Sequence, residues 1–145
     1  MKNMIAPVFA LMLSSFLVTA NAEDTKPYKE GPVIQVTYVK TKAGKFDEYM
    51  KFLATDYKAV MEAEKKAGLI VSYDVFSAQP RNPHEADLIL STTYANMAAL
   101  DKDEEGDAVV AKVMGSTAVQ NKGAQDRESL REILGSELIR ELTLK

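Results

Sequence analysis

Three tyrosines are the first candidates for a ligand-binding site. Tyr38, Tyr73 and Tyr94 fall in three separate segments that have the composition of β-strands. If those strands share one sheet, the three rings could line a pocket for a small apolar or aromatic ligand, with their hydroxyl groups orienting it. The Tyr38 hydroxyl is also a candidate for proton transfer. The competing interpretation is that tyrosine packs well in strands and that its hydroxyl group finds a backbone partner.

His84 is the only histidine in the chain and the second candidate for chemistry. It follows two prolines in the segment QPRNPHE and has Arg81 and Glu85 nearby in sequence. An imidazole changes charge near neutral pH, so His84 could act as a general base if a partner held it in place. The alternative is an exposed loop histidine with no catalytic role.

Arg140 alternates with leucines in the last segment of the chain, LIRELTL. If 137–144 is a strand, Arg140 faces the same side as those leucines, and a buried guanidinium would need an anion, from a side chain or from a ligand carboxylate. An arginine at a sheet edge would instead extend its head group to water. A helix over 137–144 is the open alternative, since Leu and Glu are good helix formers.

One acidic segment, DKDEEGD at 101–107, partly matches a calcium-binding loop. The matching positions, which are one, three, five, six and seven of that pattern, are occupied by Asp101, Asp103, Glu105, Gly106 and Asp107. Position twelve is Lys112, where the pattern needs a bidentate Glu, so a solvated acidic loop is the preferred interpretation. One His and no Cys leave too few ligands for haem or zinc. We therefore expect no cofactor.

The order of the predicted elements decides which of these residues can meet. Apolar and turn patterns predict strands at 33–40, 69–77, 87–94 and 137–144, a helix from Phe46 to about residue 66 that ends at Gly68, and helical segments near 96–100, 108–114 and 125–134. The order strand, helix, strand, strand, helical region, strand is the ferredoxin-like βαββαβ pattern. It predicts an α+β domain whose four-stranded antiparallel sheet has helices on one face.

Alternation along the strands separates two sheet faces. The more apolar set is expected beneath the helices and includes Ile34, Val36, Tyr38, Tyr73, Tyr94 and Arg140. The other set mixes apolar and polar residues and includes Gln35, Thr37 and Asp74. A half-apolar open face tends to find a partner, so we predict a homodimer through it.

The N-terminal end has the pattern of a signal peptide. Lys2 precedes an apolar run, and Ala20-Asn21-Ala22 forms a small-residue cleavage site. We expect residues 1–22 to be removed, 23–31 to be a flexible leader and 32–145 to form the domain, in a periplasmic or secreted protein with no membrane contact after cleavage. The chain has no Cys and a net charge of −3 without a basic block, which disfavours nucleic acid as a partner.

The strand VIQVTYV, the following TKAGKFDEYMKFL and the later YANMAALD resemble the dimeric α/β-barrel superfamily. That superfamily includes antibiotic-biosynthesis-monooxygenase-like, muconolactone-isomerase-like and NIPSNAP-like proteins. The resemblance implies a ferredoxin-like protomer, pairing of two protomers, and a cavity between the sheet and the helices. It does not choose an activity, since its members include oxygenases, isomerases, haem-degrading enzymes and proteins with no known activity.

Three hypotheses follow for function. The first is an exported small-ligand-binding or accessory protein. The second is a cofactor-independent oxygenase or isomerase for a small aromatic or phenolic substrate, which would use tyrosine hydroxyls and His84. The third is a structural dimer with a filled core. An open cavity between sheet and helices would favour the first two, and a closed, packed space would favour the third.

Overall fold

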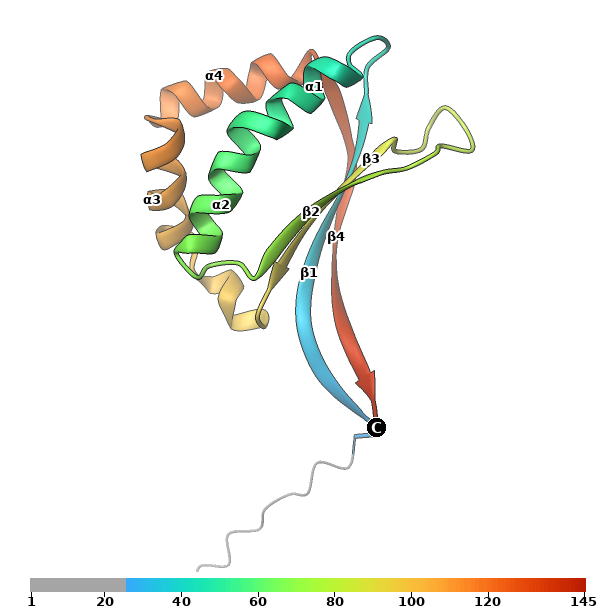
Figure 1. The fold of residues 1–145 in the computed structure, drawn as a ribbon, viewed down its shortest axis with the longest axis vertical. Coiled ribbons are helices and arrows are strands. Elements are labelled where there is room, and N and C mark those ends of the chain that lie inside the picture. The colour runs from blue at the N-terminus through green and yellow to red at the C-terminus, as the bar shows by residue number, and fades with distance from the viewer. Residues whose placement is uncertain (1–25) are drawn as a thin grey trace, which may run out of the picture.

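The computed structural model describes residues 26–145, so the predicted signal peptide at 1–22 lies outside the described residues. Figure 1 shows one sheet with helices on a single face. The elements are β1 (Tyr28–Thr41), α1 (Phe46–Phe52), the π-helix η1 (Leu53–Tyr57), α2 (Lys58–Lys66), β2 (Ser72–Ser77), β3 (Leu88–Tyr94), the 3₁₀-helix η2 (Met97–Asp101), α3 (Asp103–Met114), α4 (Thr117–Glu128) and β4 (Arg131–Leu144).

The sheet has the strand order β2-β3-β1-β4, and every neighbouring pair is antiparallel. The two βαβ-type connections place the first and third strands side by side at the centre, which is the ferredoxin-like arrangement. The predicted fold class, α+β with a four-stranded antiparallel sheet and helices on one face, is therefore confirmed.

β1 and β4 are longer than predicted. β1 begins at Tyr28, within the segment expected as a leader, and pairs with β4 as far as Leu144. The two strands extend past the helices as a ribbon (Figure 1). Residues 131–144 form a strand, so 137–144 is a strand and not a helix. The helix predicted at 125–134 ends earlier than expected, because α4 stops at Glu128. Pro32, which has no amide hydrogen to donate, lies where the β1–β4 register shifts.

The register corrects the predicted faces of β1. Val33, Gln35, Thr37 and Val39 are paired with Tyr94, Thr92, Leu90 and Leu88, and this helix-covered face carries the core. Ile34, Val36 and Tyr38 point to the open face, so their predicted place beneath the helices was wrong. β1 is apolar on both sides, and therefore period-two alternation could not distinguish its faces. For β2 and β3 the predicted faces were right, with Tyr73 and Tyr94 on the helix-covered side.

The core lies between β1, β3 and the first helix. Its central cluster consists of Val39, Tyr49, Leu53 and Leu88, each at most 4% exposed. Burying such side chains stabilises the fold by about 1.5–3 kcal/mol each. The Tyr49 ring stacks on Phe52 with centroids 5.7 Å apart. The Arg131 and Arg127 guanidinium groups lie over the rings of Tyr49 and Phe52, respectively.

The helix predicted from Phe46 to about residue 66 is present, with one turn of π-helix inside it. This wider turn, η1, separates α1 from α2 and ends at Tyr57, which packs against the core. The helix ends as predicted at Gly68, whose φ is +73°. The Gly68 and Leu69 amides donate to the carbonyl oxygens of Lys65 and Glu64, which is a Schellman C-cap.

Candidate functional site

A cavity of about 440 Å³ lies where α2 ends, β3 ends and α3 begins. It is within the size range of small-molecule sites. Its lining combines an apolar wall with polar and charged side chains, namely Leu69, Ile70, Ala99, Leu100 and Val110 together with Gln35, Glu64, Tyr94, Lys102, Asp103 and Asp107. Gly106 completes the wall formed by α3.

Three local features place the polar residues around this space. The Schellman cap turns the chain directly after α2, so that the buried Leu69 and Ile70 lie next to the helical turn that carries Glu64. Asn96 caps η2 by accepting a hydrogen bond from the Ala99 amide at 3.1 Å, which positions the start of α3. On the sheet, Tyr94 lies diagonally from Gln35, and its hydroxyl donates to the Gln35 Oε1 at 3.4 Å, a long and therefore weak bond.

Glu64 is the most unusual group of the cavity. Burial raises the pKa of its carboxyl group. Within residues 26–145 the carboxylate has no hydrogen-bond or ion-pair partner, and its oxygens remain accessible to water, because no buried side-chain oxygen there lacks a partner. The pKa of Tyr94 is also raised, first by burial and then by the negative charges of Glu64 and Asp103. The Tyr94 hydroxyl therefore stays protonated at neutral pH and can donate a hydrogen bond.

A second hollow, of about 600 Å³, lies between α1 and α4 and has a different character. Two of its carboxylates already have partners, because Glu48 pairs with Lys45 at 2.6 Å and Asp126 with Lys122 at 3.1 Å. The third carboxylate, Asp56, interacts electrostatically with the Arg127 guanidinium group that lines the same hollow, so the acidic groups there are better compensated than Glu64.

The structure separates the three predicted tyrosines. Tyr94 lines the cavity. Tyr73 shares its face of the sheet, but its hydroxyl donates to the Glu62 carboxylate at 2.7 Å, and its ring packs edge-on against Tyr57. Tyr38 lies on the open face, where its hydroxyl donates to the Glu137 carboxylate at 2.6 Å, a bond that raises the Tyr38 pKa. The predicted pocket shared by all three rings is therefore not formed.

Arg140 is held at the ribbon rather than in the cavity. Its guanidinium group pairs with the Glu30 carboxylate at 2.6 Å and donates to the Gly31 carbonyl oxygen at 3.2 Å. The anion that the sequence argument required is thus a side chain of β1, and the guanidinium remains partly exposed, as expected for an edge strand.

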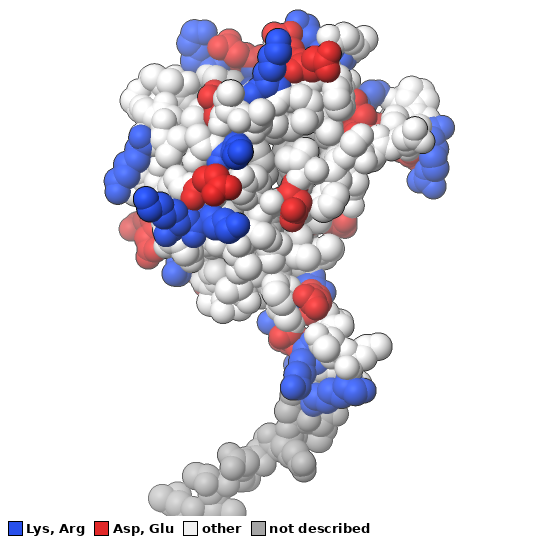
Figure 2. Space-filling view, in the orientation of Figure 1, with Lys and Arg blue, Asp and Glu red and all other residues white. Residues whose placement is uncertain are grey.

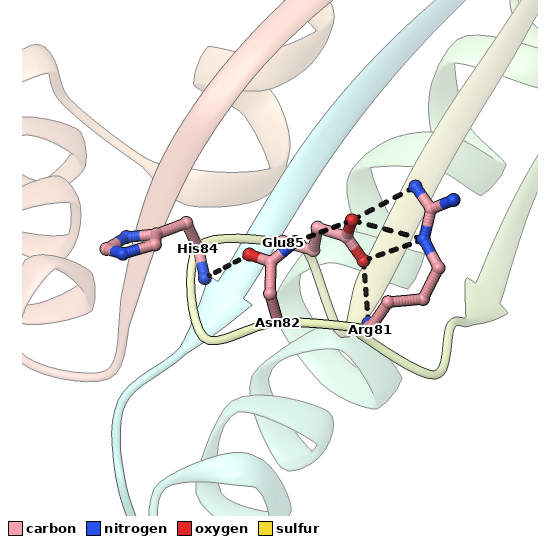
Figure 3. Close-up of polar contacts among 4 residues, drawn as sticks. All are labelled: Arg81, Asn82, His84 and Glu85. Carbon is pink, nitrogen blue, oxygen red and sulfur yellow. Dashed lines mark hydrogen bonds and ion pairs between the residues drawn. The ribbon is translucent and has the colours of Figure 1, made fainter.

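His84 lies in the exposed loop between β2 and β3. Hydrogen bonds among the residues of this loop hold it together. Glu85 accepts hydrogen bonds from the Arg81 backbone and guanidinium groups, and Asn82 accepts one from the His84 amide (Figure 3). The imidazole points away from the Glu85 carboxylate (Figure 3). This loop joins the strand ends opposite the cavity, roughly 20 Å away at about 3.3 Å per residue along β2. His84 is therefore out of reach of the cavity.

The acidic segment at 101–107 is helical instead of forming a loop. Asp101 ends η2, and Asp103 begins α3, so Asp103, Glu105 and Asp107 are distributed around a helix. Among residues 26–145, no group of three or more acidic or histidine side chains is arranged to hold a metal ion. Instead, Asp103 and Asp107 line the cavity.

Sequence reasoning missed Glu64 and placed Gln35 on the wrong face. One signal for Glu64 was available. It lies three and four residues after Met61 and Val60, so it continues the apolar stripe of the helix. A carboxylate on such a stripe faces the sheet, where burial is expected.

Comparison with solved structures finds the same architecture. The SO0527 protein from Shewanella oneidensis matches with a TM-score of 0.50 and 18% identity, covering 80% of this chain and 98% of that one. HapK from Hahella chejuensis matches at 0.48 with 15% identity, covering 75% and 91%. A dimeric ferredoxin-like protein from an uncultured marine organism matches at 0.49 with 8% identity, covering 81% and 90%.

At these identities the likeness shows the fold alone. The match to the SO0527 protein covers most of this chain, and the ferredoxin-like arrangement follows from the chain's own strand order. No protein-family model matches the chain, and no curated protein does. Within residues 26–145, no helix has the length and apolar content of a membrane span.

Proposed function

We propose that this protein binds a small ligand in the cavity at Glu64. One observation supports this function more than any other: a half-buried carboxylate without a partner in residues 26–145 borders a cavity of about 440 Å³. The carboxylate oxygens remain accessible to water, because no buried side-chain oxygen of residues 26–145 lacks a hydrogen-bond partner, so Glu64 is free to accept from a ligand that enters the cavity. Such a ligand would replace the water at Glu64, and the partly buried setting strengthens the new interaction.

The enzyme alternative gains no support from the described residues. Tyr38 is on the opposite sheet face, Arg140 is paired at the ribbon, and His84 is in the loop at the far end of β2 and β3. A general base must lie within hydrogen-bond reach of the proton that it removes. The raised pKa of Tyr94 makes its hydroxyl a hydrogen-bond donor rather than a base at neutral pH.

Gly106 provides a direct test of the cavity. A Cβ placed on this helical residue meets no atom within 4 Å, so a side chain there enters free space at the cavity wall. We would screen amines, carboxylates, phenols and divalent ions by thermal shift against the wild type, Gly106→Phe and the matched control Gly106→Ala. We expect a compound that stabilises the wild type and Gly106→Ala but not Gly106→Phe. If no compound stabilises the wild type, or if Gly106→Phe responds equally, the cavity is not a binding site and the structural alternative is favoured.

We also propose that the protein forms a homodimer through the open face of the sheet. This face carries Ile34, Val36, Ile89, Phe76 and Ile139, with Phe76 52% and Ile139 44% exposed. Figure 1 shows that no helix covers it. In the view of Figure 2, acidic and basic side chains are interspersed over the visible surface. The open face also carries polar residues such as Asp74 and Glu137, and a half-apolar exposed face of this kind tends to find a partner.

Two variants of β4 test this interface. Ile139 points to the open face, whereas Leu142 points to the other side of the same strand and is 51% exposed. We expect Ile139→Lys to convert the dimer into a monomer in light scattering, and we expect Leu142→Lys to leave the dimer intact. A wild type with the mass of one chain at all concentrations would contradict the proposed dimer.

Export is a third part of the proposal, and it rests on the sequence pattern of residues 1–22. Expression of the full chain in a Gram-negative host, followed by fractionation and N-terminal sequencing, tests it. We expect a periplasmic protein that begins at Glu23. A full-length protein in the cytoplasmic fraction would refute export.

A further inference from the structure

We infer that the cavity takes a ligand made of a protonated amine on a small apolar body, with the amine paired to the Glu64 carboxylate. This inference rests on the proposed ligand-binding function and adds the chemical class of the ligand.

The state of Glu64 favours a cationic ligand. Its carboxylate is half-buried on the cavity wall, without a hydrogen-bond or ion-pair partner in residues 26–145. A partly buried carboxylate that has no protein partner gains most from a charged donor, because charge-assisted hydrogen bonds are about twice as strong as neutral ones. An ammonium group supplies both the charge and up to three donors.

The balance of charge around the cavity also favours a cation. Glu64, Asp103 and Asp107 line it, against a single basic side chain, that of Lys102. The N-terminal end of α3 also borders the space, and a bare helix N-terminus would favour an anion. Here the first turn already contains Asp103, Glu104 and Glu105, which complement the helix dipole. The net field therefore favours a cation.

The apolar part of the cavity wall favours an apolar body for the ligand. Leu69 and Ile70 are already covered, at 7% and 5% exposed, so the apolar wall that a ligand could bury is formed mainly by the half-buried Leu100 and Val110. A ligand of charged groups only would leave this wall in contact with polar atoms, whereas an apolar body gains from burial against it. The long hydrogen bond between Tyr94 and Gln35 leaves both groups able to bond to a ligand as well.

Three probes of nearly equal shape separate these contributions: phenethylamine, which is a cation, 2-phenylethanol, which is neutral, and phenylacetate, which is an anion. Their affinities for the purified protein would be measured by calorimetry at neutral pH. Glu64→Gln keeps the size of the side chain and removes its charge. Glu104→Gln is the matched control, since it removes a nearby charge in the first turn of α3 that does not line the cavity. Circular dichroism would verify that both variants are folded.

We expect phenethylamine to bind at least about tenfold more tightly than the other two probes, a difference of about 1.4 kcal/mol. Glu64→Gln should remove this preference, and Glu104→Gln should keep it. Binding of 2-phenylethanol or phenylacetate as tight as that of the amine, or an unchanged preference in Glu64→Gln, would overturn the amine inference while leaving the binding site in place. If no probe binds but another screened compound does, the inference also fails. If nothing binds at all, the proposed function fails with it.

Discussion

Gly106 and Gly68 form a matched pair that tests how the backbone shapes the cavity. At both positions an added Cβ would meet no atom within 4 Å, so neither substitution by alanine creates a clash. Their backbones differ, because Gly68 has φ +73° at the C-cap of α2, whereas Gly106 belongs to the regular helix α3. Both substitutions also restrict the unfolded chain to the same extent. The difference between the two variants therefore isolates the native backbone conformation.

The expected signs are opposite. Gly106→Ala should raise the free energy of unfolding by roughly 0.5–1 kcal/mol, which is the cost of glycine inside a helix. At Gly68 a side chain in the left-handed region costs about 1–2 kcal/mol, and the gain from restricting the unfolded chain offsets only part of that cost. We therefore expect Gly68→Ala to be destabilised, with the two variants separated by about 1–2 kcal/mol.

Urea denaturation followed by circular dichroism would measure both values at one fixed protein concentration, because dimerisation makes stability concentration-dependent. For a domain of this size, 1 kcal/mol corresponds to roughly 4 °C in Tm, so thermal melts give an independent check. Equal effects of the two variants, or a stabilised Gly68→Ala, would refute the assignment of the Schellman cap that places Leu69 and Ile70 beside Glu64. A destabilised Gly106→Ala would refute the free space at the cavity wall.

Three further predictions concern the core and two titrating groups. Leu88→Ala should lower the unfolding free energy by about 2–5 kcal/mol in denaturation, since Leu88 is 1% exposed, whereas Leu144→Ala, at 80% exposed, should change it by less than about 0.5 kcal/mol. Burial raises the pKa of Glu64 in the folded state, so Glu64→Gln should be more stable than the wild type at neutral pH. This gain in stability should decrease as the pH falls through the folded-state pKa and should vanish below the unfolded-state pKa. A stability difference that stays constant across pH would contradict the raised pKa. In an NMR titration, Glu137→Gln should lower the raised pKa of Tyr38 toward its ordinary value, and an unchanged value would contradict their hydrogen bond.

The fold could be predicted from the sequence because segments with a helical hydrophobic pattern and segments with a strand pattern follow one another in a recognisable order. The helix stripe from Phe46 onward and the stop at Gly68 reflect local chemistry, and the structure confirms both. The faces of β1 could not be predicted, because a strand with Val33, Ile34, Val36 and Val39 is apolar on both sides. Only its pairing with β3 and β4, which is a long-range property, selects the face that the helices cover.

The candidate site was harder to predict than the fold. Tyr94 was identified from its place on β3, but Glu64 acquires its importance only when η2 and α3 close over the end of α2. The calcium-loop resemblance failed for a related reason. Asp103 and Asp107 look like loop ligands in sequence, yet good helix-forming neighbours and an acidic first turn favour the start of α3 there.

Because side chains alternate along β1, the cavity and the proposed dimer interface lie on opposite faces of this strand. Gln35 contributes to the cavity, while its neighbours Ile34 and Val36 belong to the open face. A ligand beside Glu64 would therefore contact the sheet on the helix-covered face, and a partner protomer at Ile139 would contact it on the open face. The two contacts would lie on opposite sides of β1 and share no side chain. Contacts that share no residue are expected to contribute almost additively to stability, so coupling between ligand binding and dimerisation would have to pass through a shift of the β1 backbone itself.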